Sequence, residues 1–118
     1  MAVAPGAMSR WAMNMNDEFS IIFVTSALGE SEDIARALVE ERLAACVNVA
    51  GVNSFFIWDG EFCTEKEALL IIKSKTENVE GIIERIKELH SYDLPEIIAV
   101  PIIAGDGSYL KWVEESVI

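Results

Sequence analysis

The segment 90–96 (HSYDLPE) holds the side chains of this chain that are best suited to polar chemistry. It brings together the only histidine of the sequence, the phenol of Tyr92 and the carboxylates of Asp93 and Glu96. Cu(II) favours imidazole nitrogen with oxygen partners, so His90, Asp93 and Glu96 form a candidate divalent-metal site. A structural interpretation stays open beside it, in which His90 lies on a buried helix edge and caps helix carbonyl groups.

Lys73 and Glu67 suggest a second candidate site, for a small anionic ligand. Both residues fall at odd positions of one expected strand, so their side chains point to the same face of a sheet. A lysine that closes an otherwise apolar strand could bind an anion, together with Tyr92, in a cleft between subunits. The alternative is that Lys73 marks the point where the strand reaches the surface or pairs with a glutamate.

The tryptophans and cysteines have simpler expected roles. Trp58 at a hairpin turn and Trp112 on the last helix are expected to anchor an interface between subunits. Cys46 and Cys63 form no CxxC pair, and we expect reduced thiols in the core or strands rather than metal ligands.

The sequence carries no catalytic motif. No motif places a serine or cysteine nucleophile beside the histidine, and there is no GxxxxGK[ST] phosphate loop and no HExxH helix. No enzymatic activity is therefore expected.

The net charge argues against polyanionic partners. Among 118 residues, 20 are acidic and 9 are basic, which gives a formal charge of −11. Nucleic acids and anionic membrane surfaces are bound through lysine and arginine, so neither is an expected partner. No apolar run reaches the ~18 residues of a membrane span. Residues 1–18 lack the compact apolar core of a signal peptide, so a cytoplasmic protein is expected.

The elements that must position these side chains follow from hydrophobic periodicity and turn residues. Ser31 is a good helix N-cap, and Pro95 forces the chain to leave a helix and extend. Gly51 suggests a bulge or bend, and Asp59-Gly60 predicts a type I′ hairpin turn. The expected elements are strand 19–25, helix 31–45, strand 46–58, strand 61–74, helix 77–90, strand 96–104 and a short final helix capped by Asp106 or Ser108.

The resulting order is β-α-β-β-α-β with a short C-terminal helix. This order is typical of the ferredoxin-like split βαβ fold, an α+β architecture whose four-stranded antiparallel sheet has two helices on one face. A long hairpin joins the second and third strands. We expect residues 19–118 to form this single domain and residues 1–18 to be a flexible leader.

The expected strands are apolar on both faces of the sheet. An antiparallel strand with one wet face should alternate apolar and polar residues. The runs 69–72 (LLII) and 97–103 (IIAVPII) do not alternate, so the face without helices must also be covered. Self-association is the expected cover, because a bare apolar face of this size would favour aggregation.

Five short blocks, in this order on this frame, resemble the CutA family of divalent-cation tolerance proteins. The similarity runs from Phe19 to the C-terminus. The blocks are LAACVN (43–48), FIWDG (56–60), EALLIIKS (67–74), HSYDLPE (90–96) and GDGSYLKW (105–112).

The resemblance implies a homotrimer of ferredoxin-like subunits that binds Cu(II) and other divalent metals and has no enzymatic activity. It implies no required cofactor, and its architecture is similar to that of trimeric nitrogen-signalling regulators, which keeps the anionic-ligand alternative open. Some members carry a cysteine and a His-His pair as proposed copper ligands. The corresponding residues here are Thr25 and Leu89-His90.

Overall fold

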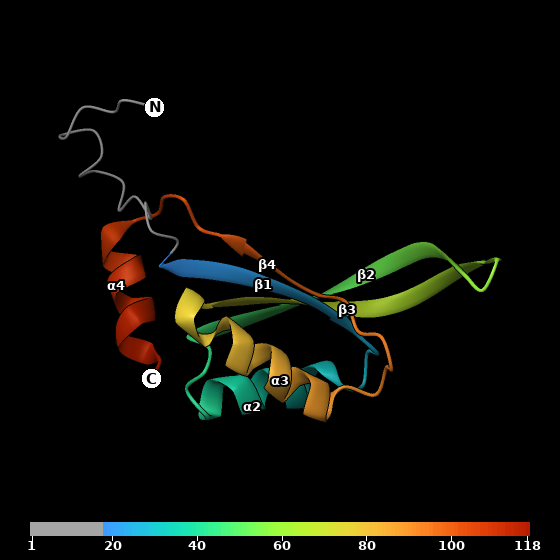
Figure 1. The fold of residues 1–118 in the computed structure, drawn as a ribbon, viewed down its shortest axis with the longest axis horizontal. Coiled ribbons are helices and arrows are strands. Elements are labelled where there is room, and N and C mark those ends of the chain that lie inside the picture. Colours follow the sequence, from blue (N-terminus) through green and yellow to red (C-terminus); the bar gives the residue numbers. More distant parts are fainter. Residues whose placement is uncertain (1–17) are drawn as a thin grey trace.

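A computed structural model describes residues 18–118 as one sheet flanked by helices (Figure 1). The predicted leader lies outside the described residues except for Glu18, whose carbonyl accepts a hydrogen bond from the Thr76 N–H at 2.8 Å. No helix in the described range is both long and apolar enough to cross a membrane. The elements are β1 (Phe19–Ser26), α2 (Ser31–Glu40), β2 (Cys46–Trp58), β3 (Glu61–Lys75), η1 (Thr76–Asn78), α3 (Val79–Leu89), β4 (Ile97–Pro101) and α4 (Gly107–Ser116).

The sheet has four strands in the order β2-β3-β1-β4, and every neighbouring pair is antiparallel. This order and the intervening helices α2 and α3 confirm the predicted ferredoxin-like fold. Because β1 and β3 are the central strands, their alternate residues supply the two faces of the sheet. The element boundaries agree with the sequence to within a few residues for most elements.

One face of the sheet packs against α2 and α3 and forms the main core. Even-numbered residues of β1 and β3 point into this core, and isoleucine and leucine at helical spacing in α2 and α3 meet them. The fully or almost fully buried residues are Ile22, Val24, Ile34, Leu38, Ala44, Leu70, Ile72, Ile82 and Ile86. Removing any of the larger ones would leave a cavity and cost about 2–5 kcal/mol of stability.

In the part of the chain that the structure describes, the opposite face is covered only at one end. There α4 packs Leu110 and Val113 against Phe19 and Ala45, at the end of the sheet away from the hairpin (Figure 1). The other apolar residues of this face are half-buried or exposed among the described residues. We call them the free face: Ile21, Phe23, Leu69, Ile71, Ile98 and Val100. The non-alternating strands therefore do carry apolar side chains on both sides, as the sequence indicated.

The β2–β3 hairpin extends beyond the rest of the sheet (Figure 1). Its turn residues Asp59 and Gly60 have φ angles of 51° and 78°, which confirms the predicted type I′ geometry. The pairing runs from Cys46↔Lys73 to Trp58↔Glu61 without interruption. The predicted bulge at Gly51 is therefore wrong, because this glycine pairs in register with Ala68.

Predicted boundaries of α2 and β4 differ from the structure in ways that have a physical reason or exceed two residues. Glu30, not Ser31, is the N-cap of α2, and the Ser31 hydroxyl donates to the Leu28 carbonyl instead. The helix ends at Glu40 rather than near residue 45, because Arg42 adopts the left-handed region with φ 62° and breaks the hydrogen-bond ladder. β4 ends at Pro101, three residues before the predicted end.

Candidate functional site

The segment 90–96 crosses from the C-terminus of α3 to β4 and lies beside the end of β1. His90 is the C-cap of α3, and its N–H donates to the Ile86 carbonyl at 2.8 Å. Its backbone is extended there, with φ −86° and ψ 137°, so the helix stops and the following residues turn toward the sheet. The segment 90–96, which we call the joint, therefore connects a helix to a strand as the sequence predicted.

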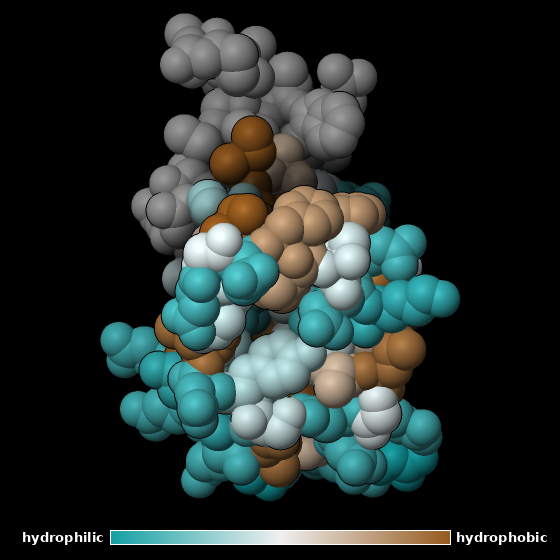
Figure 2. Space-filling model, turned by 90° about the vertical axis from the view of Figure 1, so that its right-hand side faces the viewer, coloured by the Kyte–Doolittle hydropathy of each residue, from teal (hydrophilic) through white to brown (hydrophobic). Residues whose placement is uncertain are grey.

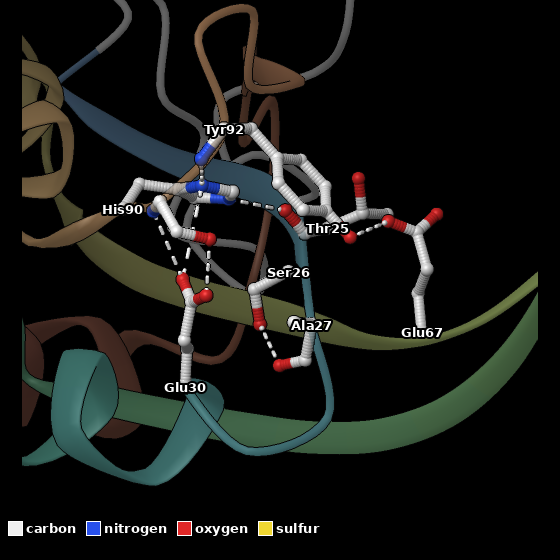
Figure 3. Close-up of polar contacts among 8 residues, drawn as sticks. Thr25, Ser26, Ala27, Glu30, Glu67, His90 and Tyr92 are labelled. Atoms are coloured by element: carbon white, nitrogen blue, oxygen red, sulfur yellow. Dashed lines mark hydrogen bonds and ion pairs between the residues drawn. The ribbon is translucent and has the colours of Figure 1, made fainter.

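The imidazole of His90 is buried and uses both ring nitrogens (Figure 3). Nε2 lies 2.7 Å from the Thr25 carbonyl oxygen, and Nδ1 accepts a hydrogen bond from the Tyr92 N–H at 3.1 Å. This pairing fits the neutral tautomer with its proton on Nε2. The imidazole therefore does bind a backbone carbonyl, but a strand carbonyl rather than one of its own helix.

Glu30, the N-cap of α2, reaches the same joint from another element (Figure 3). Its carboxylate accepts hydrogen bonds from the Ser91 N–H, at 3.1 Å, and from the Ser91 hydroxyl. Its Oε1 lies 4.0 Å from His90 Nδ1. The hydrogen bond from the Ser91 hydroxyl, and then the one from the Ser91 N–H, hold the pKa of Glu30 below its ordinary value, so this carboxylate is ionised at neutral pH.

Tyr92 links the joint to β3. Its hydroxyl donates to Glu67 Oε2 at 3.0 Å, and its ring meets the His90 ring edge-on with centroids 4.7 Å apart (Figure 3). Burial, and then the Glu67 carboxylate, raise the pKa of Tyr92 to about 12. The phenol is therefore a fixed hydrogen-bond donor at physiological pH. Glu67 itself is only 6% exposed.

A cavity of about 720 Å³ opens between the hairpin and the segment 90–96. Its polar wall contains the carboxylates of Glu65, Glu67, Asp93 and Glu96, and no lysine, arginine or histidine of residues 18–118 lines it. Figure 2 looks at the molecule from the hairpin end, where apolar groups lie between hydrophilic ones. The remaining lining residues are Thr25, Ser54, Phe55, Phe56, Trp58, Cys63, Tyr92 and Leu94.

The predicted metal ligands separate into two environments. Asp93 and Glu96 line the cavity, whereas His90 does not. Within residues 18–118, no group of three His, Cys, Asp or Glu side chains is arranged to hold a metal ion. Both nitrogens of His90 are already bonded inside the subunit, so a metal ligated here must displace the Tyr92 N–H or the Thr25 carbonyl.

The predicted anion site is also divided. Glu67 and Tyr92 lie together, but Lys73 is near the other end of β3, where its ammonium group donates to Asn48 Oδ1. Lys73 and Glu67 do share a face of β3, but about 20 Å of strand separates them. The predicted interface tryptophans are both about half exposed, Trp58 at the hairpin and Trp112 on α4.

Sequence reasoning missed Glu30, Ser91 and the Thr25 carbonyl as members of this site. Thr25 and Glu30 come from the β1–α2 region, at least 60 residues before His90. The acidic start of the first helix was visible in the sequence, but no local pattern says that Glu30 meets Ser91.

The model of the CutA1 divalent ion tolerance protein family matches residues 20–116 of the chain. The chain belongs to the CutA1 family. Its relatives include the divalent-cation tolerance protein CutA of Thermus thermophilus, 49% identical over 84 residues that cover 70% of this chain and 82% of the relative. The chloroplastic CutA protein of Arabidopsis thaliana is 39% identical over 98 residues, covering 81% of this chain and 54% of the relative.

Solved CutA1-family structures share this fold. The structure of the protein described as the periplasmic divalent cation tolerance protein CutA of Archaeoglobus fulgidus has a TM-score of 0.82 at 38% identity, covering 85% of this chain and 99% of that one. The Thermus thermophilus structure has a TM-score of 0.81 at 41% identity, with the same coverage. The resemblance found in the sequence blocks is thereby confirmed.

Proposed function

We propose that this CutA1-family chain is a non-enzymatic divalent-cation tolerance protein that acts as a homotrimer and binds Cu(II) or a similar divalent ion. The observation that carries the proposal is the wall of four carboxylates beside the segment 90–96, which no basic side chain of the described residues accompanies. Carboxylates and imidazole suit divalent cations. An anionic ligand would meet repulsion on this wall, so the cation is the better match.

The proposed ligands are Asp93 and Glu96 from the cavity, with His90 Nδ1 from the joint. One subunit presents these groups in two environments, so the proposal requires a rearrangement of the joint or a ligand from a neighbouring subunit. The rearrangement is proposed at Nδ1, because Tyr92, whose N–H donates to this nitrogen, is 38% exposed and water can replace that hydrogen bond.

A Cu(II) titration followed by native mass spectrometry tests oligomer and stoichiometry together. We expect a trimer that takes up copper saturably, with one ion per subunit. The variants Asp93→Asn and His90→Ala should each weaken uptake at least tenfold, because each removes one ligand. Glu84→Gln removes one negative charge from an exposed position on α3 and should leave uptake unchanged.

Two results would contradict the proposal. A graded uptake without saturation that all variants share would mean that the acidic surface simply attracts cations. A monomer would contradict the assembly. The proposal includes a cytoplasmic location for this chain. Its relatives differ in location, because they include proteins described as periplasmic and as chloroplastic.

A further inference from the structure

Residues 116–118 tie the end of α4 to two elements that are distant in the sequence (Figure 1). After α4 the backbone is extended at Val117, with φ −113° and ψ 162°. The Ile118 N–H donates to the Arg42 carbonyl at 3.0 Å, and the Ile118 main-chain oxygen accepts from the Asn78 side-chain amide at 3.3 Å. We call residues 116–118 the strap, because they connect α4 to the turn after α2 and to η1.

Arg42 binds the strap through two different groups. Its carbonyl accepts from Ile118, and its Nε donates to the Ser116 carbonyl at 3.4 Å. The Ser116 carbonyl is one of the last four carbonyls of α4, which lack a partner within the helix. Arg42 therefore completes the end of α4, and its left-handed backbone also ends α2.

α4 has little apolar support of its own. Two of its ten residues, Leu110 and Val113, are buried, and they pack against Phe19 and Ala45. Helices shorter than about 12–15 residues are marginal in water, so this helix depends on the contacts that hold it to the sheet. Its first turn is capped by the Asp106 carboxylate, which accepts from the Tyr109 N–H at 2.9 Å. Its last turn depends on the strap.

We propose that the strap keeps α4 docked over one end of the free face, and that α4 opens as a separate unit when the strap is released. Elements with few buried apolar contacts open locally at a lower free energy than the core, and α2 and α3 are fixed by the main core. Opening would uncover Phe19, which lies on the same face of β1 as Ile21, and would extend the free face.

The inference requires neither the proposed metal site nor the proposed trimer. Where a neighbouring subunit contacts Trp112, the strap also fixes the position from which α4 makes that contact.

Hydrogen exchange of the intact protein, followed by mass spectrometry, tests the inference with two variants at one residue. Ile118→Pro removes the N–H that donates to Arg42, and the extended backbone of Val117 suits a following proline. Ile118→Val keeps this N–H and is the matched control, because residue 118 is 70% exposed and its side chain contributes little packing. Loss of one hydrogen bond should speed exchange of residues 107–116 roughly two- to tenfold in Ile118→Pro alone.

Arg42→Gly tests the second contact of the strap. Glycine adopts the left-handed backbone at no steric cost, so this variant removes the guanidinium group and keeps the end of α2. It should also speed exchange of α4, while exchange of α3 stays unchanged in all three variants.

Two results would overturn the inference. Equal exchange of α4 in Ile118→Pro and Ile118→Val would mean that the contacts of Leu110 and Val113, or a neighbouring subunit, hold α4 without the strap. Exchange that rises equally in α3 and α4 would mean that α4 opens only when the whole fold opens.

Discussion

His90 has a structural role that limits its ability to bind a metal ion. Its two ring nitrogens join a strand carbonyl from β1 to a backbone N–H two residues onward. The ring is buried and both of its nitrogens are bonded. Its bond to the Tyr92 N–H helps to position Tyr92, whose hydroxyl donates to Glu67. Metal binding through His90 must compete with these hydrogen bonds, which is why the acidic cavity rather than the imidazole carries the functional proposal.

Tyr92 should titrate unusually late among tyrosines. Burial and Glu67 raise its pKa to about 12 from 10.0, so the folded state holds the phenolic proton more tightly than the unfolded chain. The free energy of unfolding should therefore fall as pH rises from about 10 to about 12, and Tyr92→Phe should remove this fall.

Ultraviolet absorbance of tyrosinate measures this directly. The sequence has two tyrosines, so Tyr109→Phe leaves Tyr92 as the only reporter. A midpoint near 12 agrees with the burial and the Glu67 contact, whereas a midpoint near 10 would show that the phenol is solvated and free of Glu67.

The hairpin is the element that brings the aromatic wall to the cavity. Its uninterrupted register places Phe55, Phe56 and Trp58 along one stretch of β2, and the turn at Asp59-Gly60 fixes that register. A slip of one residue would exchange the two faces of the hairpin, so that Phe56 and Trp58 would point to the opposite side. The turn is therefore as important for the cavity as the lining residues.

Gly60→Ala should lower the free energy of unfolding by about 1 kcal/mol, because an alanine at φ 78° is strained even though no atom lies within 4 Å of the new Cβ. Gly51→Ala is the matched control, since Gly51 also has open space around a Cβ but lies in a paired strand without a positive φ. Urea denaturation of both variants measures the difference. Equal stability of the two variants would contradict the strain argument.

At the scale of the whole molecule, the free face is an apolar surface that no other described element covers. It joins apolar residues of β1, β3 and β4, and Ile98 is 54% exposed there. An apolar face of this kind is typical of an interface between subunits. It is the structural support for the proposed trimer, together with the exposed hairpin aromatics.

Val100→Lys should dissociate the proposed trimer, because it places a charge within the apolar free face. Val39→Lys is the matched control: Val100 is 40% exposed on the free face and Val39 is 41% exposed on α2. Sedimentation velocity should show monomers or unstable oligomers for Val100→Lys alone. Assembly that survives Val100→Lys would place the subunit contacts elsewhere.

The fold was accessible from the sequence because its signals are local. Helical and strand periodicity, the Asp59-Gly60 turn and the break before Pro95 each act within a few residues, and together they specify the β-α-β-β-α-β order. The end of α2 at Glu40 was missed because it depends on left-handed Arg42, and a left-handed residue other than glycine has no strong sequence signature.

The sequence by itself determined the fold class, the family and the identity of the acidic and aromatic side chains near the hairpin and the segment 90–96. Only the tertiary structure decided which side chains meet. Glu30 binds Ser91, Tyr92 binds Glu67, and Lys73 binds Asn48 at a distance from the other two pairs. The reason is physical. Local patterns report which face a side chain occupies, whereas contacts between residues 25 to 65 positions apart depend on how the strands pair and how the connecting segment crosses the sheet.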